Sequence, residues 1–283
     1  MSDPVQVYIL TFCRKAELFY GTELIFRTLR VGFPNAHVTV VDNASLPEMR
    51  EKIQSLAIES ACNFRQISGR SVAHHDFLEQ TIREVATRGN QPATVVFLDP
   101  DLCFWQSCED FQFDSLIAGK GVSRWYDKLN TVTMPRIHTS FLWIPDVAKL
   151  WEAIRRIRFY YFDFQPFLSF SFNMDGVWYR YDTGAGLVNA MPDKVSCFAE
   201  EHMERYDHIF AGSHMDWLLP IIGGEHKEMM FQIHQWAKEG NLQALKGIRH
   251  RQDEVWEKAG YSQERPPPRA AGTTLAPGEC TRG

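Results

Sequence analysis

Blocks of apolar residues divide the first hundred positions into alternating short and long segments. Short β-branched and aromatic runs predict strands at residues 5–12, 37–41, 63–67 and 95–98. Between them, large apolar side chains recur every three or four residues, which predicts helices at about residues 15–29, from residue 47, and at about 74–86. This β-α-β-α-β-α-β order is typical of a parallel sheet with helices on both faces.

Local signals refine the expected ends of some elements. Ser45 and Glu48 have the spacing of a capping box, and Pro47 suits the first helical position, so we expect Ser45 to cap the second helix. After residue 105 the pattern is less regular. Residues 119–121 and 127–130 are typical of loops, residues 138–144 of a strand, and Pro145 of a following helix start.

The end of the chain differs in its sequence pattern from the first 224 residues. From about residue 225 to 259 the pattern favours two amphipathic helices. Residues 262–283 contain three consecutive prolines and almost no bulky apolar side chains, which is typical of a disordered tail. We therefore expect one domain at residues 1–224, a helical extension packed on it at 225–261, and the tail.

Composition excludes several classes of protein. The 283 residues are 45% hydrophobic and 23% charged, enough for a core of normal size, and the net charge of −5 argues against nucleic acid as a partner. The start lacks the features of a signal peptide, and no apolar run reaches the length of a membrane span. Six scattered cysteines without CxxC pairs are typical of reduced, mostly buried thiols, so we expect a cytoplasmic protein.

The most informative stretch follows the strand at 95–98. Asp99 and Asp101 flank Pro100, which has no N–H with which to continue the sheet. Side chains two residues apart on extended backbone point the same way, so both carboxylates can converge at the carboxyl end of the strand, where open α/β sheets bind ligands. Such a pair suits a divalent cation that holds phosphates, although Asp-Pro-Asp is also ordinary turn chemistry.

Polar residues also end two other strands. Thr11 and Asp42 should reach the same edge of the sheet, because right-handed crossovers align the strands in parallel. The Asp42 carboxylate can accept hydrogen bonds from a base or ribose there. It could equally be a turn residue or a helix cap.

Three stretches together resemble family 2 nucleotide-sugar glycosyltransferases, which have a GT-A fold. They are residues 8–12 (YILTF), 40–45 (VVDNAS) and 97–101 (FLDPD), which resemble the opening strand, the base-contacting second strand and the DxD motif of that family. The resemblance covers the first 105 residues well and the next hundred loosely. It implies a Rossmann-like, mostly parallel sheet flanked by helices.

The same resemblance implies the components of the site. Asp42 would contact the base, commonly uracil, which points to a UDP-sugar as donor. Asp99 and Asp101 would hold Mn²⁺ or Mg²⁺ against the diphosphate, with Asp101 the direct ligand and Asp99 nearer the ribose. Thr11 would line the nucleotide site.

Two later segments add candidate residues. Asp182 precedes Thr183 and Gly184 at an apparent helix start, where it could cap the helix, deprotonate an acceptor hydroxyl as general base, or do both. It resembles the Asp-Thr-Gly that some bacterial members of the superfamily place on the acceptor side, and Asp175 is the next candidate for the base. Residues 208–213 resemble the late histidine segment of GT-A enzymes, which implies His208 as a third metal ligand and His214 as the alternative.

Aromatic residues are dense at positions 159–172. They could form a wall that stacks against sugars, a lid over an acceptor, or a patch in peripheral contact with a membrane. Packing in the core beneath a long loop is the interpretation that we favour.

These observations predict a metal-dependent glycosyltransferase that moves a sugar from a nucleotide-diphosphate donor to a hydroxyl of a glycan or another acceptor. A nucleotidyltransferase is the alternative enzyme, but it prefers a glycine-rich basic loop after its first strand, whereas only Arg14 and Lys15 follow here. A non-catalytic carbohydrate- or partner-binding protein of the same fold is the third hypothesis. The donor sugar, the acceptor, the stereochemical outcome and the oligomeric state stay open.

Overall fold

The computed structural model describes residues 4–88, 93–126, 131–160, 164–211 and 224–258. The chain divides into two compact units, each assembled from separate segments. The first comprises residues up to 72, 95–111 and 200–256, and the second comprises 73–94 and 112–199 together with the end of the chain. Each unit is described by itself below.

The first unit contains four parallel strands in the order β4-β1-β2-β3. Their bounds are β1 Gln6–Thr11, β2 His37–Asp42, β3 Asn63–Gln66 and β4 Val95–Leu98. In this register Thr11 lies beside Asp42, and Leu98 lies beside Ile9 on the other side of β1. The carboxyl ends of β1, β2 and β4 therefore share one edge, as the sequence pattern predicts.

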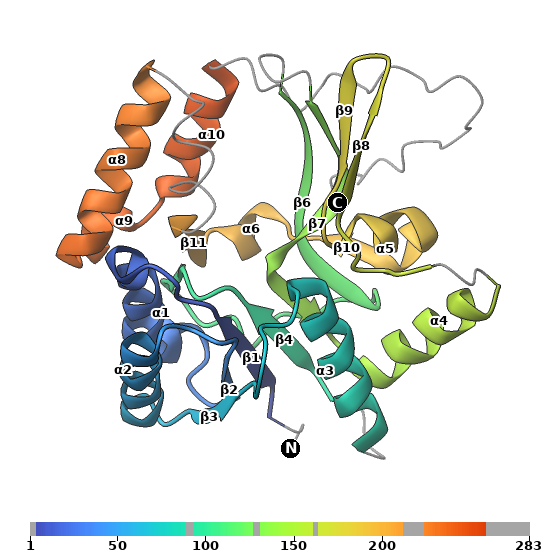
Figure 1. Ribbon diagram of the computed structural model, residues 1–283, viewed down its shortest axis with the longest axis horizontal. Helices are drawn as coiled ribbons and strands as arrows, with labels where there is room; N and C mark the ends of the chain where they lie inside the picture. The colour runs from blue at the N-terminus through green and yellow to red at the C-terminus, as the bar shows by residue number, and fades with distance from the viewer. Residues whose placement is uncertain (1–3, 89–92, 127–130, 161–163, 212–223, 259–283) are drawn as a thin grey trace. The chain divides into compact units, whose positions relative to one another are not determined.

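Two long helices of this unit follow β1 and β2 (Figure 1). They are α1 (Phe19–Gly32) and α2 (Pro47–Glu59). A 3-10 turn at Ala16–Leu18 precedes α1, so the helix begins later than residue 15. Gly32 must be small, because a Cβ there would lie 2.5 Å from the Phe104 ring. The close approach lets α1 support the strand that follows the Asp-Pro-Asp turn.

The capping box expected at Ser45 is wrong. Leu46 is the N-cap residue of α2, and no side chain in the described part of the chain caps this end of the helix. Ser45 Oγ instead accepts a hydrogen bond from the amide of Cys13 at 2.8 Å. This longer-range bond joins the loop after β1 to the loop after β2, which outweighs the local cap.

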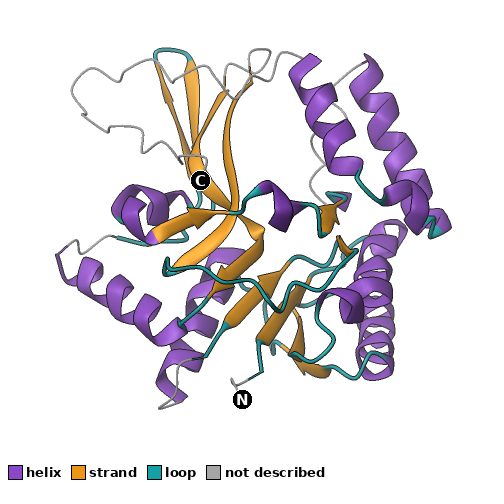
Figure 2. Ribbon diagram, turned by 180° about the vertical axis from the view of Figure 1, so that it is seen from behind, coloured by secondary structure: helices purple, strands orange, loops and turns teal. Residues whose placement is uncertain are grey.

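The remaining elements of the first unit come from residues 102–104 and from the segment that starts at residue 200. They are strands β5 (Leu102–Phe104) and β11 (Tyr206–His208), which pair antiparallel, and helices α6 (Glu200–Met203), α8 (Gly224–Glu239), α9 (Leu242–Leu245) and α10 (Ile248–Lys258). Both views show α8 and α10 running side by side (Figures 1 and 2). On α8, Met230 and Ile233 are buried, as their spacing predicts.

The second unit contains a mixed sheet in which β6 and β7 pair antiparallel. β10 joins β6 in parallel, β9 joins the start of β7 in parallel, and β8 pairs antiparallel with β9. The bounds are β6 Ile117–Tyr126, β7 Thr131–Ile144, β8 Phe170–Met174, β9 Val177–Tyr181, β10 Val195–Cys197, α3 His74–Arg88, α4 Val147–Tyr160 and α5 Ala185–Ala190, with a 3-10 turn at Pro192–Lys194. Residues 119–121 therefore belong to a strand, and the loop expected there is wrong.

The expected fold class is confirmed: the protein is α/β, with a mostly parallel central sheet flanked by helices and a helical C-terminal part. The domain boundaries at 224 and 261 stay a prediction, and the tail from residue 262 lies outside the described residues.

Cys13, Cys62, Cys103 and Cys108 are free and buried, as expected. Cys197 is disulfide-bonded, which the expectation of reduced thiols did not include. Within the described ranges, no helix combines the length and the apolar character that crossing a membrane requires.

Candidate metal and nucleotide site

The Asp-Pro-Asp turn leaves β4 at its carboxyl end and is held in place by backbone groups. Asp101 Oδ2 accepts a hydrogen bond from the amide of Ala211 at 2.7 Å, and its carbonyl accepts one from the amide of Ile209 at 3.1 Å. A Cβ added to Gly21 of α1 would lie 3.2 Å from the Asp101 Cβ, so the helix packs closely beneath the turn. Asp101 is consequently buried and has little freedom to move.

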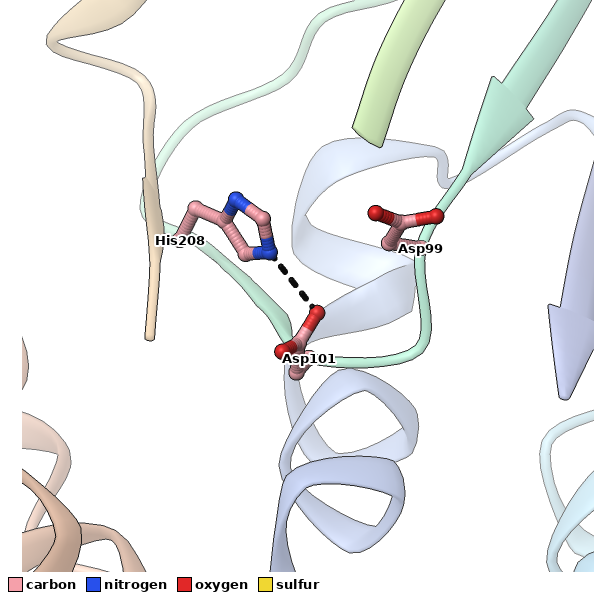
Figure 3. A group of neighbouring side chains, drawn as sticks. All are labelled: Asp99, Asp101 and His208. Atoms are coloured by element: carbon pink, nitrogen blue, oxygen red, sulfur yellow. Dashed lines mark hydrogen bonds and ion pairs between the residues drawn. The ribbon is translucent and has the colours of Figure 1, made fainter. Parts of the chain in front are cut away.

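His208 approaches the same turn from β11. Its Nε2 lies 2.9 Å from Asp101 Oδ1 (Figure 3). The antiparallel pairing of β11 with β5 places His208 opposite Leu102, the residue that follows Asp101. Asp99 points toward the imidazole from the other side of the turn (Figure 3), and ligand atoms of all three residues lie within 4.8 Å of one another.

The electrostatics of Asp101 favour the ionised carboxylate. Burial by itself would raise the pKa of Asp101, but the charge of His208 and the hydrogen bonds from His208 and the Ala211 amide act against burial. The net result is a pKa below the usual range. The site therefore offers a negative charge beside an imidazole.

These three side chains fit a divalent cation. Carboxylate oxygens are the ligands that Mg²⁺ prefers, and an imidazole beside them is compatible with Mn²⁺. Bonds of about 2.1 Å would separate ligand atoms on one ion by at most about 4 Å. A spacing of up to 4.8 Å thus needs only a small movement of the side chains.

Asp207 holds β11, and with it His208, against the C-terminal helices. Its carboxylate accepts hydrogen bonds from Trp105 Nε1 at 2.7 Å and from the amides of Gly247 at 2.7 Å and Arg249 at 2.9 Å. Gln252 of α10 adds a bond to the His208 carbonyl at 3.3 Å. Asp207 therefore binds the first turn of α10, a role that the sequence analysis missed because the partners lie about forty residues or more away.

Thr11 and Asp42 lie side by side at the edge of the sheet, both fully buried. Thr11 Oγ1 donates to the Val41 carbonyl at 3.3 Å, and Asp42 Oδ1 accepts a long bond of 3.4 Å from the amide of Ser45. Among the described residues, Asp42 Oδ2 has no hydrogen-bond partner although it is buried. Because an unpartnered buried carboxylate oxygen is costly, this position suits a donor group from a ligand.

Tyr20 and His234 form a buried pair whose electrostatics depend on Asp101, and the sequence did not predict this pair. The Tyr20 hydroxyl of α1 and His234 Nδ1 of α8 lie 2.8 Å apart, and Nε2 of the same imidazole is buried without a partner among the described residues. Burial lowers the pKa of His234 to about 4, with Lys238 acting in the same direction and the charge of Asp101 opposing both. Burial and the charge of Asp101 also raise the pKa of Tyr20. No local signal could reveal a contact across 214 positions.

Asp182 lies in the second unit and does not cap α5. The N-cap residue is Gly184, whose φ of 96° is left-handed and which has no room for a Cβ beneath the Ile137 carbonyl. Asp182 Oδ2 lies 3.1 Å from Arg136 and 3.4 Å from Arg180. Helix capping, one of the two roles open to Asp182, is therefore wrong, because two guanidinium groups and the amide of Thr183, at 2.9 Å, hold the carboxylate instead.

Asp175 is the alternative to Asp182 as general base, and His214 is the alternative to His208 as metal ligand. Asp175 lies in the turn between β8 and β9 with a φ of 53°, a conformation that aspartate adopts more readily than most residues. His214 lies outside the described residues. Among the described residues, His208 is the histidine that contacts Asp101.

The core packing favoured for the aromatic segment is wrong for four of its six described rings, while Tyr161 and Phe162 lie outside the described residues. Phe159 and Tyr160 are 80% and 76% exposed, and Phe170 and Phe172 are also exposed. Phe167 alone of these five is buried, at 1%. On the β8–β9 hairpin, Phe170 stacks on Tyr181 across the strand pair, with ring centroids 4.8 Å apart. The sugar-stacking and membrane-contact hypotheses for these rings stay open.

Comparisons with known proteins add the following similarities. The bifunctional glycosyltransferase WbbM matches with a TM-score of 0.45 and 12% identity over 83% of this chain and 45% of its own. GlyE, a glycosyltransferase of Streptococcus pneumoniae, matches with a TM-score of 0.45 and 10% identity over 94% of this chain and 66% of its own. The galactosyltransferase LgtC matches with a TM-score of 0.42 and 9% identity over 82% of this chain and 95% of its own.

The chain thus spans less than two thirds of the length of WbbM and GlyE. No protein-family model matches the sequence. No curated protein matches it either.

Proposed function

We propose that this protein is a metal-dependent glycosyltransferase of GT-A type that transfers a sugar from a nucleoside diphosphate donor, most simply a UDP-sugar, to an acceptor hydroxyl. The observation that carries the proposal is the cluster of Asp99, Asp101 and His208 at the carboxyl edge of a parallel sheet. Ligands of open α/β sheets bind at this edge, and the residue types are those of a Mn²⁺ or Mg²⁺ site.

The residues of the first unit would bind the donor. Asp99, Asp101 and His208 would hold the cation, which supplies charge neutralisation for the leaving diphosphate. The unpartnered Oδ2 of Asp42 would accept a hydrogen bond from the base, and Thr11 would line the same place. A uracil N–H would satisfy the buried oxygen of Asp42.

Asp182 is the proposed general base. As the acceptor oxygen bonds to the anomeric carbon, the bond from that carbon to the diphosphate breaks and the diphosphate leaves with the electron pair. Asp182 takes the proton that the acceptor hydroxyl loses. Arg136 and Arg180 would fix the orientation of the carboxylate for this transfer.

Calorimetry with UDP, in the presence and absence of Mn²⁺, tests the donor site. Wild-type protein should bind UDP only with the metal. Asp101→Asn should weaken this binding by more than about 100-fold, above the range typical of losing a group that merely supports a ligand. The asparagine keeps an acceptor for the Ala211 amide, so the fold should survive. His208→Ala should have a smaller effect, because it removes one neutral ligand.

The exposed Asp193 provides a matched control, and Asp193→Ala should bind UDP like the wild type. Metal-dependent affinity that persists unchanged in Asp101→Asn would refute the proposed site. Slow, Mn²⁺-dependent hydrolysis of a UDP-sugar by the wild type would separate a transferase from a protein that only binds nucleotides. GDP and CDP in the same titration would test the preference for uracil.

A further inference from the structure

The second unit contains a cavity to which the proposed function assigns no ligand. Its volume is about 180 Å³, and it lies between one side of α3, Arg158 of α4 and residues 165–168. Sites for drug-sized ligands are typically about 300–1,000 Å³. The cavity therefore has room for a small molecule, such as one sugar ring.

The lining of this cavity mixes strong donors with strong acceptors. From α3 come the carboxylates of Asp76 and Glu79, the carboxamide of Gln80 and the guanidinium of Arg83, with His75 beside them. Carboxylates only accept, guanidinium groups only donate, and a carboxamide does both. A ligand that satisfies such a surface must itself both donate and accept at several positions, which is the chemistry of a polyhydroxylated molecule.

The charges of the lining favour a neutral ligand. The lining contains two carboxylates, Asp76 and Glu79, and two guanidinium groups, Arg83 and Arg158. Because these formal charges cancel, the cavity has no strong attraction for either an anion or a cation. The two carboxylates would repel a phosphate group as much as the two guanidinium groups attract it, and the converse holds for an ammonium group.

An ion pair makes one wall of the cavity rigid. Arg158 Nη2 lies 2.7 Å and 2.9 Å from the two carboxylate oxygens of Glu79, which joins α4 to α3. Phe167 is 1% exposed and anchors the opposite segment in the core. Polar groups that are already held in position lose little entropy when a ligand binds.

The segment at residues 165–168, which lines the cavity, also lies next to the proposed base in the sequence and in contacts. A Cβ on Gly186 of α5 would lie 2.7 Å from the Pro166 carbonyl oxygen, so this segment packs against the helix that follows Asp182. Ser169, which comes directly after the lining residue Leu168, donates to Asp182 Oδ1 at 3.5 Å. A molecule bound in the cavity would thus be held by the same segment that contacts Asp182.

We infer that this cavity binds a neutral sugar unit of the acceptor, with Gln80 and Arg83 as direct hydrogen-bonding residues. The inference rests on the proposed function and specifies its acceptor as a neutral carbohydrate. It assigns Glu79 and Arg158 to positioning, because they are already bonded to each other.

Saturation-transfer NMR with the methyl glycosides of glucose, galactose, mannose and N-acetylglucosamine tests this inference. Wild-type protein should transfer saturation to at least one of these at millimolar concentration. Arg83→Ala should weaken that binding about tenfold or more, as expected for loss of a hydrogen bond that involves a charged group, and Gln80→Ala should weaken it about fivefold, as expected for a neutral one. Arg88→Ala is the matched control, since this exposed arginine lies on the same helix but not in the cavity.

The outcomes separate this inference from the proposed function. UDP titrations with Mn²⁺ on the same variants should match the wild type, because donor binding belongs to the first unit. If wild-type protein binds UDP normally but transfers saturation to none of the glycosides, the acceptor site is refuted and the donor site stands. Two further results would overturn the acceptor site. One is that Arg88→Ala weakens glycoside binding as much as Arg83→Ala does. The other is that the protein prefers glucose 6-phosphate or glucosamine to the neutral glycosides.

Discussion

The buried imidazole of His234 should make the stability of the protein sensitive to acid. Its pKa is about 4 instead of the ordinary 6.5, because burial disfavours the charged ring. As the pH falls below 6.5, the unfolded chain takes up this proton before the folded protein does. The unfolded state then binds more protons, so the free energy of unfolding decreases. The stabilisation is complete above pH 6.5 and is lost as the pH falls toward 4.

The magnitude follows from the difference of about 2.5 pKa units. At 1.36 kcal/mol per unit, the full loss is about 3 kcal/mol below pH 4, and about 2 kcal/mol is already lost at pH 5. This is a large part of the stability of an ordinary domain. Asp101 and Lys238 influence the same ring in opposite directions, so the magnitude depends on their charges as well.

Urea unfolding of wild type and His234→Gln between pH 8 and pH 5 measures this effect. Glutamine does not titrate, and its carbonyl oxygen can accept the hydrogen bond from Tyr20. Carboxylates titrate alike in both proteins, so the difference between the two pH profiles isolates the imidazole. The wild type should lose about 2 kcal/mol more than the variant over this range. His250→Gln, at an exposed histidine, is the control and should follow the wild type. Parallel profiles for wild type and His234→Gln would refute the reasoning.

Replacing Asp182 should lower activity but not stability, whereas replacing Asp207 should lower stability. Asp182→Asn should leave stability and UDP affinity near normal but lower kcat by about 100-fold or more with an acceptor glycoside, because the amide cannot take a proton. Turnover equal to the wild type would leave Asp182 as a structural partner of Arg136. Asp207→Ala should instead lower the free energy of unfolding by about 3 kcal/mol, since three donors lose their acceptor. Urea unfolding measures this, and a loss as small as that of Asp193→Ala would contradict the role of Asp207.

The strands and their polar ends could be predicted from the sequence because the signals are local. The runs at residues 37–41 and 95–98 are β-branched and apolar, and each is followed by a carboxylate where the strand ends. Parallel pairing then brings Asp42 and the Asp99–Asp101 turn to one edge of the sheet. Asp99 and Asp101 are separated by one residue, so no long-range information is needed to place them together.

The errors arose where a local signal competed with a distant partner. Ser45 has the spacing of a capping box, but its hydroxyl bonds to the amide of Cys13, 32 residues away. Asp182 precedes a helix, but Arg136 and Arg180 hold its carboxylate. A residue that can cap a helix can equally bind a backbone or a cation elsewhere, and the local pattern is the same in both cases.

The sequence by itself thus determined the parallel sheet, the edge at which its strands end and the carboxylates at that edge, because these follow from periodicity and from neighbours along the chain. Only the tertiary structure decided that His208 meets Asp101, since this contact depends on the pairing of β5 with β11 across 107 positions. The same is true of the Tyr20–His234 pair and of the cavity beside Arg83. Burial and charge at these places are set by side chains from distant segments, and no periodicity in the sequence records which segments will pack together.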